Sequence, residues 1–106
     1  MFRDRFIQAI HDKKKLKIEF YSAEDGHAIT RICAPMDIGP GRKHVQDRSD
    51  RYWVWDYESD GPKGPHSLPI KPEHIRSMEP TGDLFDPQEF IRTFSSAPSW
   101  FIPRDW

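Results

Sequence analysis

The stretch Arg51-Tyr-Trp-Val-Trp-Asp-Tyr57 decides the fold class, because it places four aromatic residues in one short segment between two polar loops. Its alternation predicts a β-strand inside a sheet. Successive side chains on a strand point to opposite faces, so Trp53, Trp55 and Tyr57 share one face, whereas Val54 and Asp56 share the other. The aromatic face is either a core layer or a stacking platform for a flat ligand, and the sequence leaves both alternatives open.

Length and charge limit what the chain can be. Its 106 residues make one domain, in which 36% of residues are hydrophobic and 31% are charged. The formal net charge of -1 excludes a strong attraction of the whole molecule to nucleic acid or anionic lipid. Any such binding must therefore come from a local patch of basic side chains.

The lone cysteine, Cys33, excludes an internal disulfide framework and favours a reducing compartment. No apolar run approaches the ~20 residues that cross a bilayer. The N-terminus begins with alternating charges instead of a signal peptide. We therefore expect a soluble, cytoplasmic protein that has no membrane partner and no cofactor.

Patterns on both sides of the aromatic stretch predict the other elements. Apolar residues with helical spacing predict an amphipathic helix from Phe2 to about Lys13. Alternating residues from Leu16 to Tyr21 and from Ala28 to Ala34 predict a hairpin around Gly26. We further expect a short strand at 36–38, a loop at 39–50, a loop at 59–65, an edge strand at 67–70, a short element around 75–78, a turn at 80–82 and a helix at 86–94 capped by Asp86 and Glu89.

The order of these elements resembles the WYL-domain family, whose members are small SH3-like or Sm-like β-barrels preceded by a helix. Similar features are Ala9-Ile10, Ile18-Glu-Phe-Tyr21, Arg31-Ile-Cys-Ala-Pro35 and Phe85-Asp86-Pro87. Tyr52-Trp53-Val54 stands where the family shows Trp-Tyr-Leu, and His66 and His74 stand at two positions where the family has arginine. The resemblance spans roughly residues 2–90 and implies a mainly β domain with flanking helices, which we place at residues 1–94. Residues 95–106 form a separate aromatic tail.

The resemblance also implies a non-catalytic module that senses a ligand and binds a nucleotide or single-stranded nucleic acid. Arg31 is the one basic family position retained, and a guanidinium both pairs with phosphate and stacks on a base. The expected ligand-binding residues are Arg31, Trp53, Trp55, Tyr57, His66 and His74. We expect Arg31 to lie beside the indole rings. Because histidine is mostly neutral at pH 7, binding would strengthen toward pH ~6.

A second basic cluster lies in and after the loop at 39–50. Arg42, Lys43, Arg48 and Arg51 are possible phosphate-binding residues. Asp47 and Asp50 interrupt the cluster, which also fits a solvated loop with local ion pairs.

Metal and catalytic motifs are weak or missing. The segment 56–61 has the oxygen ligands and glycine of a calcium loop, but Ser67 occupies the twelfth position and the bidentate glutamate is missing. The histidines are too evenly spread for a zinc site. We find no nucleophile motif, and Cys33 has nothing nearby in the sequence that would activate it, so we predict neither a metal site nor an enzyme.

The tail suggests a protein-interaction or homodimerisation module as the alternative function. Trp100, Phe101 and Trp106 are unusual in a disordered segment and are typical of buried or interface positions. The tail could pack on its own domain, on a second copy or on a partner protein.

Overall fold

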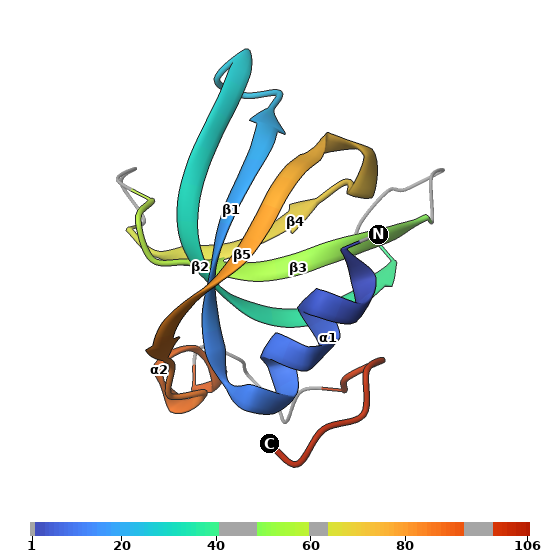
Figure 1. Ribbon diagram of the computed structural model, residues 1–106, viewed down its shortest axis with the longest axis vertical. Helices are drawn as coiled ribbons and strands as arrows, with labels where there is room; N and C mark the ends of the chain where they lie inside the picture. Colours follow the sequence, from blue (N-terminus) through green and yellow to red (C-terminus); the bar gives the residue numbers. More distant parts are fainter. Residues whose placement is uncertain (1, 41–48, 60–63, 93–98) are drawn as a thin grey trace.

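The computed structural model describes residues 2–40, 49–59, 64–92 and 99–106. These residues form helix α1 (Arg3–Asp12), strands β1 (Lys14–Ser22), β2 (His27–Pro40), β3 (Asp50–Asp56) and β4 (His66–Ile70), the 3₁₀-helix η1 (Pro72–His74), strand β5 (Ile75–Leu84) and helix α2 (Gln88–Ile91). The described strands make one antiparallel sheet in the order β4-β3-β2-β1-β5 (Figure 1). The predicted mainly β fold with flanking helices is therefore confirmed, but the sheet is not closed.

The sheet must curl strongly, because one short link joins its two edge strands. Strand β4 ends at Ile70 and β5 begins at Ile75, and the 3₁₀-helix η1 occupies most of the link. A 3₁₀-helix rises only ~2 Å per residue. Five flat strands would span about 19 Å, from four gaps of ~4.8 Å, so the link is too short to cross a flat sheet. Figure 1 shows the resulting bend.

Helix α1 covers one end of the inner face of this curled sheet. Its buried residues Phe6, Ala9 and Ile10 follow the predicted amphipathic pattern. The helix ends at Lys13, which adopts the left-handed conformation with φ 55° and donates its backbone N–H to the Ala9 and Ile10 carbonyls. The chain then enters β1 directly, so this end of the helix reverses into the sheet without a loop.

The predicted hairpin is confirmed. Strands β1 and β2 pair in register from Leu16 with Cys33 to Ser22 with His27. Gly26 has φ 77° in the turn, a conformation that glycine adopts without steric cost. Beyond this hairpin, however, the prediction that the strand ends before Pro35 is wrong.

Strand β2 continues through Pro35 to Pro40 because a β-bulge absorbs the irregularity. Pro35 pairs with Val54 and Asp37 pairs with Trp53, so Met36 is an extra residue with no opposite partner on β3. A bulge is one of the places where a sheet accepts proline, which has no N–H for the ladder. The short strand expected at 36–38 is therefore the second half of one long strand.

The element expected around 75–78 is the first part of the longer strand β5, and the turn expected at 80–82 is wrong because those residues also lie within β5. Pro80 and Gly82 are tolerated because β5 is an edge strand. The predicted edge strand near Pro69 is confirmed as β4. Helix α2 is shorter than the predicted 86–94, and residues 93 and 94 lie outside the described residues.

Helix α2 has Pro87 instead of the expected Asp86 as its N-cap residue, and Pro87 has no side-chain cap, but Asp86 and Glu89 still bond to backbone groups there. The Asp86 carboxylate accepts from the Gln88 backbone N–H at 3.0 Å, and the Asp86 N–H donates to Glu89 Oε1 at 3.1 Å. These two bonds satisfy backbone donors that precede the first full turn.

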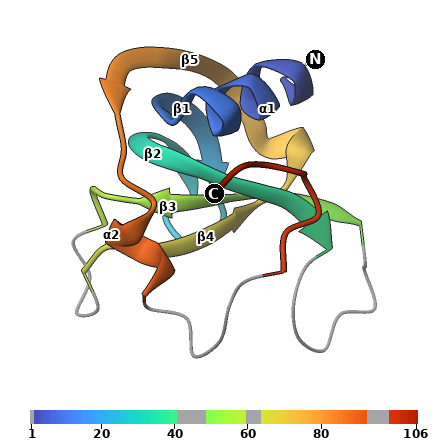
Figure 2. The same ribbon diagram turned by 90° about the horizontal axis from the view of Figure 1, so that it is seen from below.

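Two apolar clusters lie on the two faces of the sheet. The inner cluster joins α1 to the strands and includes Leu16, Ile18, Cys33 and Val54. The outer cluster contains Ala34, Met36, Phe85 and Phe90, with partly buried aromatic rings against them. Helix α2 and the tail at 99–106 contribute to the outer cluster, and the tail runs across β2 and beside α1 (Figure 2).

Candidate ligand-binding pocket

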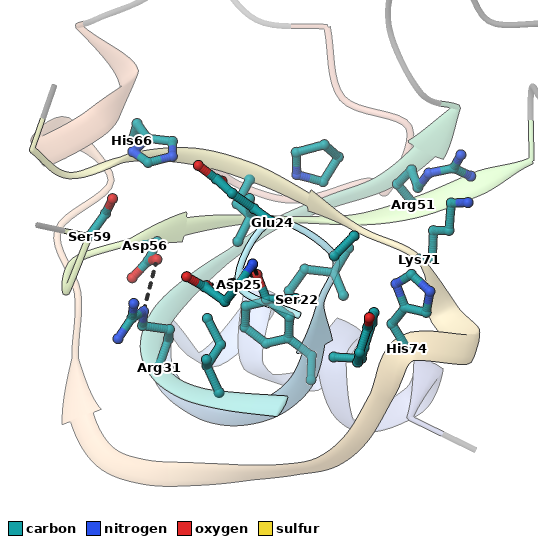
Figure 3. A pocket seen from close by; sticks show the side chains of 17 residues that line it. Ser22, Glu24, Asp25, Arg31, Arg51, Asp56, Ser59, His66, Lys71 and His74 are labelled. Carbon is teal, nitrogen blue, oxygen red and sulfur yellow. Dashed lines mark hydrogen bonds and ion pairs between the residues drawn. The ribbon is translucent and has the colours of Figure 1, made fainter. Parts of the chain in front are cut away.

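A pocket of about 280 Å³ opens between the tip of the β1–β2 hairpin and strands β3 and β4 (Figure 3). Its wall continues the inner face of the sheet beyond the part that α1 covers. The lining residues that carry charge, imidazole, phenol or hydroxyl groups are Tyr21, Ser22, Glu24, Asp25, Arg31, Arg51, Asp56, Ser59, His66, Lys71 and His74. This volume lies just below the ~300–1,000 Å³ typical of ligand sites, so the pocket suits a small ligand.

Strand alternation places Arg31 on the inner face between Ile29 and Cys33. Its Nε lies 3.5 Å from Asp56 Oδ2, and the two side chains are 28% and 5% exposed. Within the described part of the chain, Arg31 Nε is buried and has no hydrogen-bond partner. The contact with Asp56 is thus an ion pair that leaves one donor of the guanidinium unsatisfied.

Asp56 is a buried acid in the wall of the pocket. Its Oδ1 accepts the Glu58 backbone N–H at 2.9 Å. Burial raises the pKa of Asp56 above its usual value, although the Glu58 hydrogen bond and the positive charges of Arg31 and His66 oppose the rise. Asp56 is therefore a carboxylate that takes up a proton more readily than an exposed aspartate does.

The buried thiol of Cys33 is paired in register with Asp56. Burial raises the pKa of this thiol, and the negative charges of Asp56 and Glu58 raise it further. A thiol in such surroundings stays protonated at neutral pH and is a poor nucleophile.

Both predicted histidines lie at the pocket. His66 is the register partner of Asp56, and its Nδ1 lies 2.9 Å from the Gly64 carbonyl. Since a carbonyl oxygen only accepts, Nδ1 carries the proton and Nε2 is the acceptor in the neutral ring. His74 meets the Tyr21 ring edge to face, with 5.4 Å between centroids. The structure thus brings Arg31, His66 and His74 into one pocket (Figure 3).

Arg51 is the one residue of the predicted phosphate cluster that the structure describes, and it lies at the rim of the pocket. Its Nη1 donates to the backbone carbonyl and the hydroxyl of Ser49, at 3.0 and 2.7 Å. Arg42, Lys43 and Arg48 lie outside the described residues, so the loop cluster remains a prediction.

The aromatic row of Trp53, Trp55 and Tyr57 does not line the pocket, and the expectation that Arg31 lies beside it is wrong. Trp53, Trp55 and Tyr57 are partly buried against the outer cluster, and Trp55 stacks on Phe90 with centroids 5.8 Å apart. Arg31 instead contacts Asp56, which alternation places on the other face of β3. Of the two alternatives for the row, the structure therefore favours a core layer.

Polar groups hold this aromatic face in place. Trp53 Nε1 donates to the Gly39 carbonyl at 3.3 Å, and the Tyr57 hydroxyl lies 3.2 Å from Glu89 Oε1. Burial and the charge of Glu89 raise the pKa of Tyr57, so the phenol stays protonated and donates. Such fixed rings are poorly placed to open for a stacking base.

Residues 99–106 of the tail pack on their own domain, which is one of the three expected alternatives. Asp37 accepts the backbone N–H groups of Phe101 and Ile102 at 3.0 and 2.9 Å, and Arg104 Nη2 lies 3.2 Å from Asp37. Trp106 Nε1 donates to the Ile10 carbonyl of α1 at 2.9 Å.

Of the three predicted interface anchors, Phe101 remains exposed, at 66%. Trp100 and Trp106 pack on the outer cluster, where they take part in the fold of their own domain.

Sequence reasoning missed six polar groups that line the pocket, which are Tyr21, Ser22, Glu24, Asp25, Ser59 and Lys71. It also missed the role of Asp56, although alternation already placed Asp56 opposite the tryptophans. The sequence signal for Asp56 was a charged residue that follows the apolar Val54 on the same face of the strand. Glu24 and Asp25 gave none, because the same residues also identify an ordinary hairpin turn.

The described residues contain no group of three or more potential ligands that could hold a metal ion. Positions 60 and 61 of the calcium-like segment lie outside the described part of the chain. Among the described helices, none is long and apolar enough to span a membrane.

Comparisons with protein-family models, with curated proteins and with solved structures gave no match to this chain. The resemblance to the WYL-domain family therefore stays a prediction from the sequence.

Proposed function

We propose that this protein is a non-catalytic ligand-binding module that senses a small anionic molecule, with a nucleotide as the leading candidate. The proposal includes a WYL-like domain in which the curled sheet corresponds to an SH3-like or Sm-like barrel. It also places the protein in the cytoplasm, where the lone thiol of Cys33 stays reduced.

One observation supports this proposal above all: three residues that are far apart in the sequence converge on one pocket. Arg31 comes from β2, His66 from β4 and His74 from η1. Arginine and protonated histidine bind phosphate through charge-assisted hydrogen bonds. The Tyr21 and His74 rings could contact a base or another flat group.

The charges of the pocket favour a small polar ligand over a long polyanion. Glu24, Asp25 and Asp56 stand against Arg31, Arg51 and Lys71, so acids and bases balance along the lining. A long nucleic-acid strand is bound best by a continuous basic groove, which this lining does not provide. We therefore place single-stranded nucleic acid below a mononucleotide as the proposed ligand.

Chemical-shift mapping tests the proposal directly. We would titrate the ¹⁵N-labelled full chain with adenosine and guanosine monophosphates and with a short oligonucleotide at low salt. The backbone signals of Tyr21, Arg31, His66 and His74 are expected to move together. Signals of Trp53 and Trp55 are expected to move less, since those rings lie on the other face.

A matched pair of variants separates the pocket from general charge. Arg31→Gln removes a positive charge inside the pocket, and Arg76→Gln removes one from an exposed position of β5 outside it. We expect Arg31→Gln to weaken nucleotide binding about tenfold or more, as the loss of a charge-assisted contact does. We expect Arg76→Gln to bind like the wild type. An equal effect of both variants would contradict the pocket as the binding site.

A further inference from the structure

Strand β4 forms one long side of the pocket and gives it two distinct ends. His66 lies at one end, Ile70 lies at the other, and Lys71 follows directly after the strand. From His66 to Ile70 the strand advances four residues, which is about 13 Å at ~3.3 Å per residue. A compact ion such as inorganic phosphate cannot reach both ends at once. A ligand that contacts both ends is therefore elongated and carries different chemical groups along its length.

The first end is the one at which the proposed function places the phosphate. Asp56 pairs in register with Cys33 of β2 and with His66 of β4, so the three strands align there. Arg31 contacts Asp56 at this end, and its side chain is 28% exposed. Because Asp56 offsets part of the Arg31 charge, contacts beyond the phosphate have to supply much of the affinity and the specificity.

Two rings mark the second end. The His74 imidazole meets the Tyr21 ring edge to face, with 5.4 Å between centroids and 69° between planes. The His74 backbone N–H donates to the Lys71 carbonyl at 2.9 Å, which joins His74 to a residue whose side chain also lines the pocket (Figure 3). A nucleobase is attracted to such rings by stacking. Its edges then face the side chains that surround the rings.

The side chains around these rings are of two opposite kinds. Glu24 and Asp25 closely follow Tyr21 in the chain, and their carboxylates only accept hydrogen bonds. The Ser22 hydroxyl donates to Asp25 Oδ2 at 2.8 Å and so orients that carboxylate. The Lys71 ammonium, in contrast, only donates. Figure 3 shows both carboxylates on the hairpin side of the pocket and Lys71 on the opposite side. A base held here thus meets acceptors on one side and a donor on the other.

Guanine is the nucleobase whose edges match this arrangement. It carries two adjacent donors, N1–H and the 2-amino group, and two adjacent acceptors, O6 and N7. A carboxylate accepts from both donors at once, and a cation donates to both acceptors. Adenine alternates instead, because its 6-amino donor lies between the acceptors N1 and N7. Cytosine and uracil also lack two adjacent donors. A carboxylate that faces any of these three bases therefore meets an acceptor.

We infer that the pocket selects guanine nucleotides. Glu24 and Asp25 accept from N1–H and the 2-amino group, and Lys71 donates to O6 and N7. The phosphate lies toward Arg31 and His66. This assignment also accounts for the balanced charges of the lining, because acids that would repel a plain anion recognise the base instead. The inference rests on the proposed function and adds the identity of the base.

Three nucleotides with the same ribose and phosphate test the selectivity. Guanosine monophosphate carries the full set of groups, inosine monophosphate lacks the 2-amino group, and adenosine monophosphate has the alternating edge. We would measure the affinity of each for the full chain by calorimetry at one pH and at low salt. A site built to hydrogen-bond a ligand group rejects analogues that lack it. We expect the guanosine nucleotide to bind about tenfold or more tightly than the adenosine nucleotide, with the inosine nucleotide between them.

Variants assign this selectivity to its residues. The double variant Glu24→Gln with Asp25→Asn replaces both carboxylates by amides of similar size and is expected to remove most of the preference for guanosine over adenosine monophosphate. Lys71→Met removes the donor and is expected to weaken the guanosine and inosine nucleotides more than the adenosine nucleotide. Glu73→Gln and Lys17→Met change exposed residues outside the pocket and are expected to keep the wild-type preference.

The preference is read as a ratio of two affinities within one variant. Because the nucleotides carry the same phosphate, this ratio cancels a change in general charge. Far-UV circular dichroism and urea unfolding verify that each variant is folded.

The outcomes separate this inference from the proposed function. Equal affinity for guanosine and adenosine monophosphates would overturn the inference and leave the pocket as a nucleotide site. A preference for guanosine that survives in both the carboxylate double variant and Lys71→Met would overturn it too. A preference lost in only one of them would assign base selection to that group and overturn the role of the other. A chain that binds none of the three nucleotides would overturn the proposed function as well.

Discussion

Two arginine–aspartate pairs, Arg104–Asp37 in the tail and Arg31–Asp56 in the pocket, differ in how many partners the arginine has among the described residues. In the tail pair, Arg104 Nη2 bonds to Asp37, Nε donates to the Ile102 carbonyl and Nη1 donates to the Met36 carbonyl. The guanidinium carbon also lies 4.0 and 4.6 Å from the ring centroids of Trp100 and Trp106. In the pocket pair, Arg31 Nε lies 3.5 Å from Asp56 Oδ2 and has no hydrogen-bond partner among the residues that the structure describes.

The two pairs differ in how completely the protein satisfies the hydrogen-bond donors of the arginine. A buried ion pair is tolerated when further hydrogen bonds satisfy both partners, as they do around Arg104 and Asp37. Burial lowers the pKa of Arg104 to about 10, so the guanidinium is still charged at neutral pH. Among the described residues, no acceptor forms a hydrogen bond with Arg31 Nε, and such a buried donor calls for a physical explanation.

The largest expected effect comes from breaking the tail pair. Arg104→Gln leaves Asp37 buried without its cationic partner and removes a guanidinium that contacts two indole rings. Loss of one partner of a buried pair typically costs about 3–5 kcal/mol. Urea unfolding followed by tryptophan fluorescence would measure it, with the exposed Arg76→Gln as control. A loss below about 1 kcal/mol would contradict the structural role of the tail pair.

A smaller effect on stability is expected from the pocket pair. Arg31→Gln removes one ion-pair contact of a partly exposed side chain, and Asp56 keeps its hydrogen bond from Glu58. Because the Asp56 carboxylate is buried but Arg31 is 28% exposed, we expect a loss above the ~0–1 kcal/mol of an exposed pair and below the ~3–5 kcal/mol of a fully buried one. The same urea experiment measures the change. If Arg31→Gln destabilised the protein as much as Arg104→Gln does, the contrast between the two pairs would be false.

The smallest expected effect is a pH dependence of stability that comes from Asp56. Because burial raises the pKa of Asp56, the folded protein binds this proton more tightly than the unfolded chain does. The stability of the wild type relative to Asp56→Asn is therefore expected to be greatest in acid and to fall as the pH rises above about 4. Urea unfolding of both proteins between pH 3.5 and 7 measures this difference. The opposite slope would mean that Arg31 stabilises the ionised carboxylate more than burial destabilises it.

The local pattern of the sequence predicted much of the fold. Alternation in residues 51–57 identified β3 and separated Trp53, Trp55 and Tyr57 from Asp56 correctly. Helical spacing gave α1, and the turn at Gly26 gave the hairpin. These features depend on neighbouring residues alone, which is why a single sequence reveals them.

The site was predicted only in part, because its assembly depends on register. Alternation gives each strand two faces but does not say which face of β2 matches which face of β3. The pairing of Cys33 with Asp56 decides that Arg31 shares its face with Asp56 and lies away from Trp55. Prolines 35 and 80 also misled the prediction, since a bulge and a sheet edge accommodate them.

The extra residue at the β2 bulge reverses the alternation of side chains between the two faces of the sheet. Before it, Cys33 packs in the inner cluster and Ala34 in the outer one; after it, Met36 packs in the outer cluster and Ile38 in the inner one. Even-numbered side chains thus change sides between positions 36 and 38. A chain shortened by one residue here would keep its composition and its apolar content, yet it could not serve both clusters in the present register. Deletions should therefore be far less tolerated at this point than at the tip of the β1–β2 hairpin.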